Sequence, residues 1–301
     1  MDQAGLPAVG DVEMRQEIVG ALLLAGILAG LSDPTAAQTS HCDKPCLMEV
    51  MDRFVDEMTG SPEGVLPISP SAEVRENTRR VELDATAWKD VASVRSRITF
   101  ADPITGNVVS RSGVELSDGR PGYISTRIKI LDGEVVDVEL SSDSSERVVE
   151  PYVYGVAQMF AEPLPMAQRS SRNELEAIAR RYFQDLTDHS PDPEDHVESC
   201  NRFHSGQQIT NVELNAIEAG GMMTCFSSLG GSPPWGPAAE QRFPVIDPDS
   251  GIVFGVTLLH YDDGRQMYVS EVFRIVGGRI ALIDNIGLML DPPVETLGFT
   301  H

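Results

Sequence analysis

Arg202 and His204 are the two residues whose types and spacing point most directly to chemistry. They lie two positions apart in the segment SCNRFHS, where we predict a short strand over 202–205. Side chains two residues apart emerge on the same face of a strand. An imidazole titrates near neutral pH, and a guanidinium stabilises negative charge that develops on an oxygen. The pair predicts a site that moves a proton beside an electron-rich oxygen; the alternative is a salt bridge at the surface or between domains.

Tyr182 and His260 are further candidates for the same site. Tyr182 lies within an apolar helical stripe, so its hydroxyl either donates a hydrogen bond into a cavity or is satisfied within a packed core. His260 ends the segment IVFGVTLLH on the same face as alternate apolar residues, and a structural role beside the turn is the alternative. Arg127 and Glu271 alternate with apolar residues on predicted strands, and we expect them to face solvent or to pair across strands.

The helix that carries Tyr182 has a counterpart near the start of the chain. In two segments, apolar residues recur at the i, i+3, i+4, i+7 spacing of a one-faced helix. They are Leu47, Val50, Met51, Phe54, Val55 and Met58 in the first segment, and Leu175, Ile178, Ala179, Tyr182, Phe183 and Leu186 in the second. Every position is shifted by 128 residues, which indicates an internal duplication.

The hairpins that follow each helix repeat as well. Residues 118–125 read DGRPGYIS and residues 263–270 read DGRQMYVS, and the match runs without a gap at an offset of 145. DG and GG pairs mark the tight turns. We predict strands over 107–116, 123–131 and 134–140 in the first copy, and over 252–261, 267–276 and 279–285 in the second. The two offsets differ by 17 residues, so the second copy carries an insertion, which we place in a Gly- and Pro-rich loop over 220–237.

These repeats predict two α+β domains, each a helix followed by a curved antiparallel sheet. The predicted parts are a first domain over 43–145, a linker over 146–170 that packs against other elements, a second domain over 171–290 and a loose tail over 291–301. The helix offset places Glu76 of the first copy at the position of His204 in the second. Because the insertion belongs to the second copy, we expect a pocket there and a first copy that is degenerate or used for contacts.

The N-terminal region predicts export. Residues 18–31 form an apolar run of 14 residues, short for a membrane span, and a cleavage site after Ala37 follows. We therefore predict a signal peptide over 1–37, with Met14 as an alternative start of translation, and a periplasmic or secreted protein; an uncleaved anchor is the alternative.

Four cysteines then meet an oxidising compartment, where one or two disulfides can form. They are Cys42, Cys46, Cys200 and Cys225. The sequence leaves all three complete pairings open.

Charge and missing motifs narrow the partners. A formal net charge of -23 repels phosphates, so we expect no nucleic acid and, after cleavage of the signal peptide, no membrane partner. The chain has no Gly-rich phosphate loop, GxSxG elbow or HExxH helix, and we predict neither a cofactor nor a metal. The sequence leaves a homo-oligomer open.

Three segments carry a resemblance to a known family. ADPITGNVV, STRIKILDGEVVDVE and RFPVIDPDSGIVFG resemble those of exported tandem-domain proteins in the nuclear transport factor 2-like superfamily, which includes SnoaL-like polyketide cyclases and ketosteroid isomerase. The resemblance implies two tandem cone-shaped domains, each with an N-terminal helix packed on a curved antiparallel sheet. In ketosteroid isomerase-like members a carboxylate on the first short strand is the base and faces a phenol from a helix. That likeness implies roles for Glu76, His204 and Tyr182.

The function that the resemblance implies is a cofactor-independent lyase or isomerase. It would use acid/base chemistry on a small hydrophobic substrate, in our expectation an aromatic one, with Arg202 or Tyr182 supporting the developing oxyanion. A narrower likeness is to lyases that release formaldehyde from lignin-derived diarylpropane dimers and leave a stilbene. The alternative is a non-catalytic exported module that binds a small ligand or forms an oligomer interface.

Overall fold

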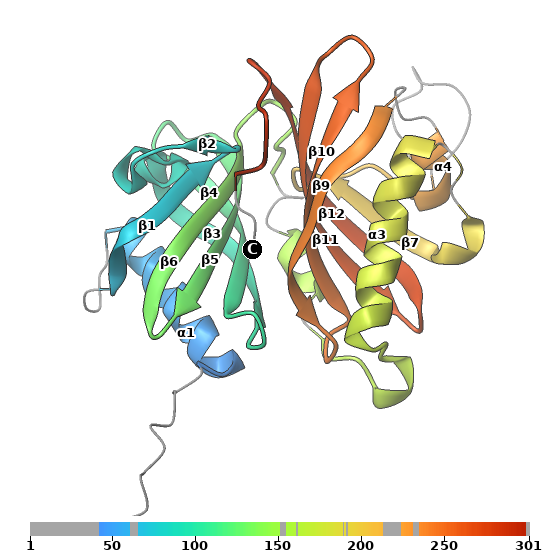
Figure 1. Cartoon of the computed structure of the whole chain (residues 1–301), viewed down its shortest axis with the longest axis horizontal. Coiled ribbons are helices and arrows are strands. Elements are labelled where there is room, and N and C mark those ends of the chain that lie inside the picture. The colour runs from blue at the N-terminus through green and yellow to red at the C-terminus, as the bar shows by residue number, and fades with distance from the viewer. Residues whose placement is uncertain are drawn as a thin grey trace, which may run out of the picture. The chain divides into compact units, whose positions relative to one another are not determined.

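Two sheets, each crossed by one long helix, make up most of the described chain (Figure 1). The structure is a computed structural model that describes residues 42–60, 66–150, 155–160, 162–188, 190, 192–212, 224–230 and 235–298. Both sheets belong to one compact unit, Thr39–His301. The predicted signal peptide over 1–37 lies outside the described residues.

The two long helices form where the apolar stripes predict them. α1 spans Lys44–Met58 and α3 spans Arg172–Asp188. Asp43 caps α1, because its carboxylate accepts a hydrogen bond from the Cys46 backbone N–H at 3.0 Å. Every residue of the two predicted stripes is buried except Met58, which is half-buried. The amphipathic pattern therefore identified the face that each helix turns to its sheet.

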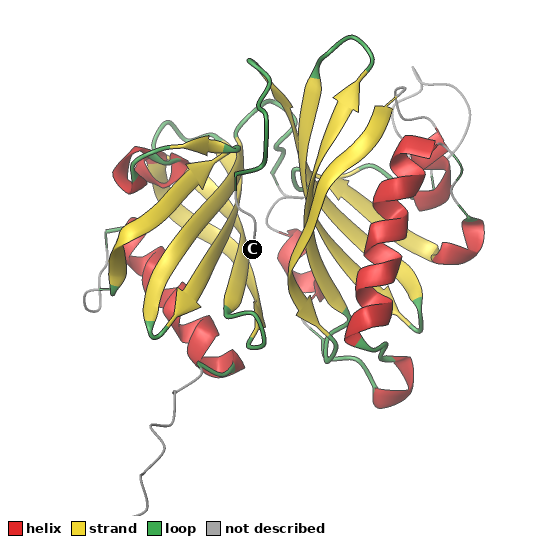
Figure 2. Cartoon of the chain, in the orientation of Figure 1, coloured by secondary structure: helices red, strands yellow, loops and turns green. Residues whose placement is uncertain are grey.

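Each half contains a six-stranded sheet (Figure 2). The strand orders are β2-β1-β6-β5-β4-β3 and β8-β7-β12-β11-β10-β9. The first sheet consists of β1 Ile68–Glu76, β2 Arg79–Arg80, β3 Val91–Asp102, β4 Asn107–Leu116, β5 Pro121–Leu131 and β6 Glu134–Asp143. The second consists of β7 His196–His204, β8 Gln207–Gln208, β9 Trp235–Asp247, β10 Ile252–Tyr261, β11 Gln266–Val276 and β12 Arg279–Leu290. The short helices are η1 Leu83–Ala85, η2 Ala87–Asp90, η3 Val156–Phe160, η4 Met166–Gln168, η5 Pro193–Asp195 and α4 Cys225–Gly230.

One strand of each sheet departs from the predicted antiparallel arrangement. β1 pairs with β6, and β7 pairs with β12, in parallel, so the sheets are mixed. A tight hairpin turn forces its two strands to run antiparallel, whereas a long crossover does not. Besides the short β2 and β8, three strands lie between β1 and β6 and between β7 and β12 along the chain. No tight turn joins the parallel partners, so the turn residues in the sequence did not indicate this pairing.

The predicted hairpin strands are present, but the inserted segment of the second half is not only a loop. β4 and β10 have the predicted bounds, and β6 and β12 run further than predicted. Within 220–237, the structure places α4, and β9 begins at Trp235. Cys225 and Leu229 of α4 are buried in the core of the second half, so tertiary packing outweighs the Gly- and Pro-rich composition.

The two sheets have the same register at corresponding residues. In each half, one residue of the last strand, β6 or β12, lies between a register partner on the parallel strand and a register partner on the antiparallel strand. The trio is Glu76, Leu140 and Thr126 in the first half, and His204, Asn285 and Glu271 in the second. Positions of the two halves can therefore be compared one by one.

The two faces of each sheet pack against different partners. The face under the helix carries the core of its own half, which includes Ile128 under α1 and Phe273 under α3. The opposite faces meet in a third apolar cluster, which contains Val109 of β4 and Phe254 of β10. The halves thus pack sheet to sheet, and the first residue of each helix also reaches the other half: Lys44 of α1 pairs with Asp247 at 2.7 Å, and Arg172 of α3 pairs with Asp102 at 2.6 Å.

The segments outside the two predicted domains are packed as well. In the predicted linker, the Phe160 ring lies 5.7 Å from the Phe100 ring between centroids. In the tail, which we expected to be loose, Leu297 is fully buried and its backbone N–H donates to Glu240 Oε2 at 2.7 Å. That expectation was wrong, because Leu297 joins the cluster between the two sheets.

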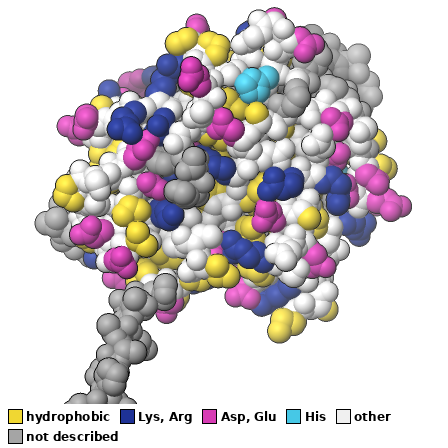
Figure 3. Space-filling view, in the orientation of Figure 1, with side chains coloured by type: hydrophobic (Ala, Val, Ile, Leu, Met, Phe, Trp, Pro, Cys, Tyr) yellow, Lys and Arg dark blue, Asp and Glu magenta, His cyan; other side chains and the backbone are white. Residues whose placement is uncertain are grey.

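The structure pairs Cys42 with Cys46 and Cys200 with Cys225. Two disulfides indicate a protein that folds in an oxidising compartment. None of the described helices has the length and hydrophobicity of a membrane-spanning segment. On the face shown in Figure 3, acidic and basic side chains are interspersed over the described surface.

Candidate functional site

The second half contains a buried carboxylate on which other polar side chains converge. Glu271 of β11 lies on the face under α3 and has no solvent exposure. Its Oε1 accepts a hydrogen bond from Asn285 Nδ2 of β12 at 2.9 Å. The Tyr182 hydroxyl of α3 donates to the same oxygen at 3.3 Å. A helix and two strands therefore hold one carboxylate oxygen.

Arg202 of β7 brings a cation to this carboxylate. Its Nη2 lies 3.8 Å from Glu271 Oε1, and its Nη1 donates to Ser228 Oγ of α4 at 3.2 Å. α4 is tethered by the disulfide between Cys225 and Cys200, and Cys200 lies two residues before Arg202 on β7. The disulfide and the serine hydroxyl thus fix the guanidinium beside Glu271. We call Tyr182, Arg202, Glu271 and Asn285 the Glu271 cluster.

Several polar atoms of the Glu271 cluster have no partner. Glu271 Oε2, Asn285 Oδ1 and Arg202 Nε are buried and make no hydrogen bond to a described residue. Nearly all buried polar atoms in proteins are hydrogen-bonded to protein or water, because an unpaired one costs about 1–3 kcal/mol. Two acceptors and one donor of the same cluster are therefore without a hydrogen-bond partner among the described residues.

Burial changes the acid/base properties of the cluster. It raises the pKa of the Glu271 carboxyl, and Arg202, Asn285, Tyr182 and the more distant Arg111 oppose that rise. Burial also raises the pKa of Tyr182 well above its usual value, so its hydroxyl remains a donor at physiological pH. A carboxyl with a raised pKa exchanges protons more readily near neutral pH than a solvated one.

The first half has the same fold without these polar groups. The residues equivalent to the Glu271 cluster are Phe54, Val74, Thr126 and Leu140. Phe54 and Leu140 belong to the apolar core, and Thr126 Oγ1 accepts a hydrogen bond from Trp88 Nε1 at 3.0 Å. The fold therefore does not need a buried charge at these positions, and the polar cluster is specific to the second half.

His204 lies beside the cluster but has its own partners. Its Nε2 lies 3.3 Å from Arg147 Nη1, and its Cε1 lies near the empty side-chain position of Gly287, which Asn285 Oδ1 also borders. Burial first, and then Arg202 and Arg147, lower the pKa of His204 to about 4. We expected this imidazole to titrate near neutral pH, whereas in the fold it is neutral there.

The other two predicted site residues lie away from the cluster. Glu76 Oε1 accepts from Ser142 Oγ at 2.5 Å, and Glu76 Oε2 accepts from the Ala87 backbone N–H at 3.1 Å. This carboxylate holds the chain at η2 in the first half. His260 lies one residue before the end of β10, where its Nδ1 lies 3.4 Å from Gln266 Nε2. The structure thus brings Tyr182 and Arg202 together and keeps Glu76 and His260 apart from them.

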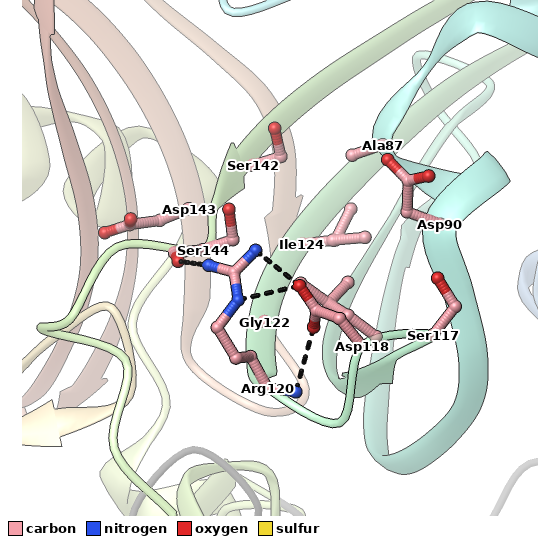
Figure 4. Close-up of a pocket in the computed structure, with 11 residues that line it drawn as sticks. Ala87, Asp90, Ser117, Asp118, Arg120, Gly122, Ile124, Ser142, Asp143 and Ser144 are labelled. Atoms are coloured by element: carbon pink, nitrogen blue, oxygen red, sulfur yellow. Dashed lines mark hydrogen bonds and ion pairs between the residues drawn. The ribbon is translucent and has the colours of Figure 1, made fainter.

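A cavity of about 260 Å³ opens in the first half (Figure 4). At its rim, Arg120 Nε donates to Asp118 Oδ2 at 2.8 Å, and Arg120 Nη1 donates to the Ser144 backbone oxygen at 3.0 Å. The cation of this cavity is therefore neutralised by neighbouring groups. Among the described residues, no three His, Cys, Asp or Glu side chains are grouped as a metal site requires.

Sequence reasoning found Tyr182 and Arg202 but missed Glu271 and Asn285. We expected Glu271 to face solvent or to pair across strands; it is completely buried, and it pairs across strands with Asn285. Its position has the same parity along β11 as Val269, Phe273 and Ile275, which all belong to the core of the second half. That parity was the available signal. Arg127 is likewise fully buried, where it pairs with Glu139 at 2.8 Å.

Among the comparisons with known proteins, the family match falls on the second half of the chain. A model of a domain of unknown function (DUF8021) matches residues 168–287, which include the Glu271 cluster. No curated protein was matched. Similar solved structures include a de novo designed protein with curved beta-sheet, at 20% identity over 38% of this chain and 92% of that chain, with a TM-score of 0.28. Another is an NTF-2 like protein of unknown function from Burkholderia xenovorans LB400, at 15% identity over 41% of this chain and 88% of that chain, with a TM-score of 0.28.

In each half one helix lies across the face of a six-stranded sheet, with the same strand order and register in both halves, as the resemblance in the sequence led us to expect. A fold does not by itself imply a function. The function therefore has to be argued from the Glu271 cluster itself.

The raised pKa of Glu271 predicts a pH-dependent stability. Above the ordinary Glu pKa of 4.5 the unfolded chain releases this proton while the folded protein retains it, so stability should fall as pH rises towards the folded pKa. Glu271→Gln removes this contribution. Urea unfolding midpoints of both proteins, measured from the ordinary Glu pKa of 4.5 upwards, should show the stability of the variant increasing relative to that of the wild type as pH rises.

His204 acts in the opposite direction but is common to both proteins. Because its pKa is lowered to about 4 in the fold, its contribution is lost as pH falls from 6.5 towards that value. Subtracting the two curves cancels it. Parallel curves for the two proteins would show that Glu271 is not perturbed by burial.

Proposed function

We propose that this protein is an exported, cofactor-independent lyase or isomerase. Its site is the Glu271 cluster of the second half, and its substrate is a small, largely apolar molecule that carries a hydroxyl or carbonyl oxygen. The two disulfides and the predicted signal peptide support a periplasmic or secreted location.

One observation carries the proposal. The second half has a buried carboxylate and its polar partners at the four positions where the first half has Phe54, Val74, Thr126 and Leu140. Taking a charge out of water costs several kcal/mol, and well-packed apolar residues of similar size are often as stable or more stable. The first half shows that this chain has such an apolar solution. Polar groups kept against that cost are typical of sites that bind or react.

The atoms of the cluster assign a role to each residue. Tyr182 and Asn285 hold Glu271 Oε1, which leaves Oε2 as the oxygen that takes a proton from a carbon of the substrate. The electron pair of that C–H bond moves into the adjacent carbonyl group of the substrate, and Arg202 Nε stabilises the carbonyl oxygen as a donor. Glu271 then returns the proton at another carbon in an isomerisation, or a leaving group departs in an elimination.

The surroundings of Glu271 set the substrate class. The core around it contains Phe183, Phe273 and Val269, so the substrate body must be apolar. Aromatic side chains there favour an aromatic substrate, and lignin-derived diarylpropane dimers that lose formaldehyde are one such class. For these dimers Oε2 takes the proton of the primary hydroxyl, the C–C bond to that carbon breaks to release formaldehyde, and its electron pair forms the stilbene double bond as the hydroxyl of the next carbon leaves with a proton as water. The alternative to an enzyme is a module that binds its ligand without converting it, and the complete burial of Glu271 favours that alternative function.

The test compares the purified full chain with a variant that carries the residues of the first half. In this variant Tyr182→Phe, Arg202→Val, Glu271→Thr and Asn285→Leu are combined. Both proteins are incubated with hydroxyketones and diarylpropane dimers, and aldehyde release, a new conjugated chromophore and ligand-induced thermal stabilisation are followed. We expect turnover and stabilisation by the wild type only.

The variant is a sharp control because the same chain already folds with these four residues in its first half. Circular dichroism should show it folded, with a stability close to or above that of the wild type. Stabilisation of the wild type without product would support the binding module instead. Equal behaviour of a folded variant and the wild type towards every active compound would contradict a site at the Glu271 cluster.

A further inference from the structure

Arg111 of the first half reaches into the second half from behind the Glu271 cluster. It lies on β4, on the face that packs against the other sheet, and its side chain is 1% exposed. The guanidinium carbon is 5.9 Å from the centroid of the Phe254 ring of the second half. A fully buried arginine between two sheets requires polar partners.

Those partners are backbone oxygens of the strands that carry the site. Arg111 Nη2 donates to the Ser270 carbonyl at 2.7 Å and to the Asp284 carbonyl at 3.2 Å. Ser270 immediately precedes Glu271 on β11, and Asp284 immediately precedes Asn285 on β12. One guanidinium nitrogen therefore joins the two strands at the residues that bear the carboxylate and its amide partner.

Side chains complete the setting of Arg111. Its Nε lies 3.6 Å from Asp284 Oδ2, and the same oxygen accepts a hydrogen bond from the Tyr123 hydroxyl at 2.5 Å. Tyr123 also comes from the first half. The side chains of Asp284 and Asn285 point to opposite faces of β12, so the first half contacts the back of the strand whose front holds the site.

Only the first half supplies an arginine at this position. The residue equivalent to Arg111 in the second half is Val256, which is fully buried in the apolar cluster between the sheets. The fold therefore accepts a valine at this position, and valine cannot donate to the carbonyls of the opposite sheet. The half that supplies the arginine lacks the polar cluster, and the half that has the cluster receives the arginine.

We propose that Arg111 is a positioning residue for the site of the second half. Through its hydrogen bonds to the Ser270 and Asp284 carbonyls, Arg111 holds the backbone of Glu271 and Asn285 in register. The inference rests on the proposed function for its role in catalysis, but the contact itself does not. This role explains why the first copy persists without a site of its own, because the first copy supports the site of the second.

The test measures the backbone and the carboxyl directly, without any substrate. In Arg111→Met, which keeps an unbranched side chain but loses the guanidinium donors, we expect the amide protons of residues 270–272 and 284–286 to exchange about tenfold faster. The pKa of Glu271, followed by NMR on the full chain labelled with carboxyl-13C glutamate, should rise further, because Arg111 opposes its rise in the wild type. The other groups that face Glu271 are Tyr182 from α3, Arg202 from β7 and Asn285 from β12, and all are unchanged in the variant.

Arg127→Met is the matched control. Arg127 is as buried as Arg111, and it donates to Glu139 and Asn107 of the first half, where Glu139 also pairs with Arg242 of β9. We expect a loss of stability in this variant without faster exchange at 270–272 and 284–286. Arg111→Lys keeps the charge but cannot reproduce the planar guanidinium, so the pKa of Glu271 should recover while exchange stays fast.

The outcomes separate this inference from the proposed function. Unchanged exchange and an unchanged Glu271 pKa in Arg111→Met would overturn the positioning role, whether or not a substrate is found. Faster exchange together with no turnover of any compound would leave the positioning role in place and count against the enzyme. If Arg111→Met does not fold, Arg111→Lys and Arg111→Val, which copies the second half, are measured in the same way.

Discussion

Replacing Glu271 with glutamine is expected to lower kcat/KM by about a thousandfold, the range that loss of a general base produces. Glutamine has the same shape, and its oxygen can still accept from Tyr182 and Asn285 as Oε1 does. Its nitrogen replaces Oε2 and cannot take a proton. The measurement is steady-state kinetics on the compound that the wild type converts best, and the loss should appear in kcat more than in KM.

A second buried carboxylate provides the comparison. Glu139 pairs with Arg242 at 2.6 Å and with Arg127 at 2.8 Å, and these ion pairs lower its pKa although burial alone would raise it. Glu139→Gln leaves buried cations without their partner, so we expect a loss of stability of about 3 kcal/mol. Glu271→Gln should instead be neutral or stabilising at neutral pH. A folded Glu271→Gln that keeps wild-type kcat would remove Glu271 from the mechanism.

Removing the disulfide between Cys200 and Cys225 is expected to lower the free energy of unfolding by about 3.5 kcal/mol in the chain-entropy description, because it closes 25 residues. The loss should extend to the site. Cys225 tethers α4, whose Ser228 accepts the Arg202 hydrogen bond, so the guanidinium loses its anchor when α4 detaches. Urea unfolding and kinetics of a variant with Cys200→Ser and Cys225→Ser measure both effects.

The disulfide between Cys42 and Cys46 is the natural control for that variant. It joins residues only 4 apart at the start of α1, so its removal should cost about 2 kcal/mol. It lies in the first half, and kcat should stay at the wild-type level. If removal of either disulfide lowers kcat to the same extent, the loss reports general destabilisation and not the position of Arg202.

The duplication explains how one chain supports both a stable fold and a costly polar cluster. A buried charge destabilises the half that holds it unless its partners are fixed in advance. In this protein the second half takes the charge, whereas the first half keeps the apolar residues Phe54 and Leu140 at the equivalent positions. The two copies have therefore diverged in role while they retain the same strand order.

Local patterns in the sequence were enough to indicate the duplication, the buried face of each helix and the positions of the hairpins. The stripes of α1 and α3 and the bounds of β4 and β10 follow from apolar spacing and turn residues, which act over a few positions. Tyr182 and Arg202 could be selected in the same way, because a polar group within an apolar stripe and an i, i+2 pair are both local patterns.

Only the tertiary structure decided what surrounds those groups. Glu271 is buried because Arg202 and Tyr182 reach it from other elements, and a strand sequence does not show which partner crosses to it. Glu76 and His204 occupy equivalent positions, yet one holds a loop and the other contacts Arg147, since their neighbours differ. Arg111 acts on strands that lie more than a hundred residues away in the chain, and only the packing of the two sheets brings it there.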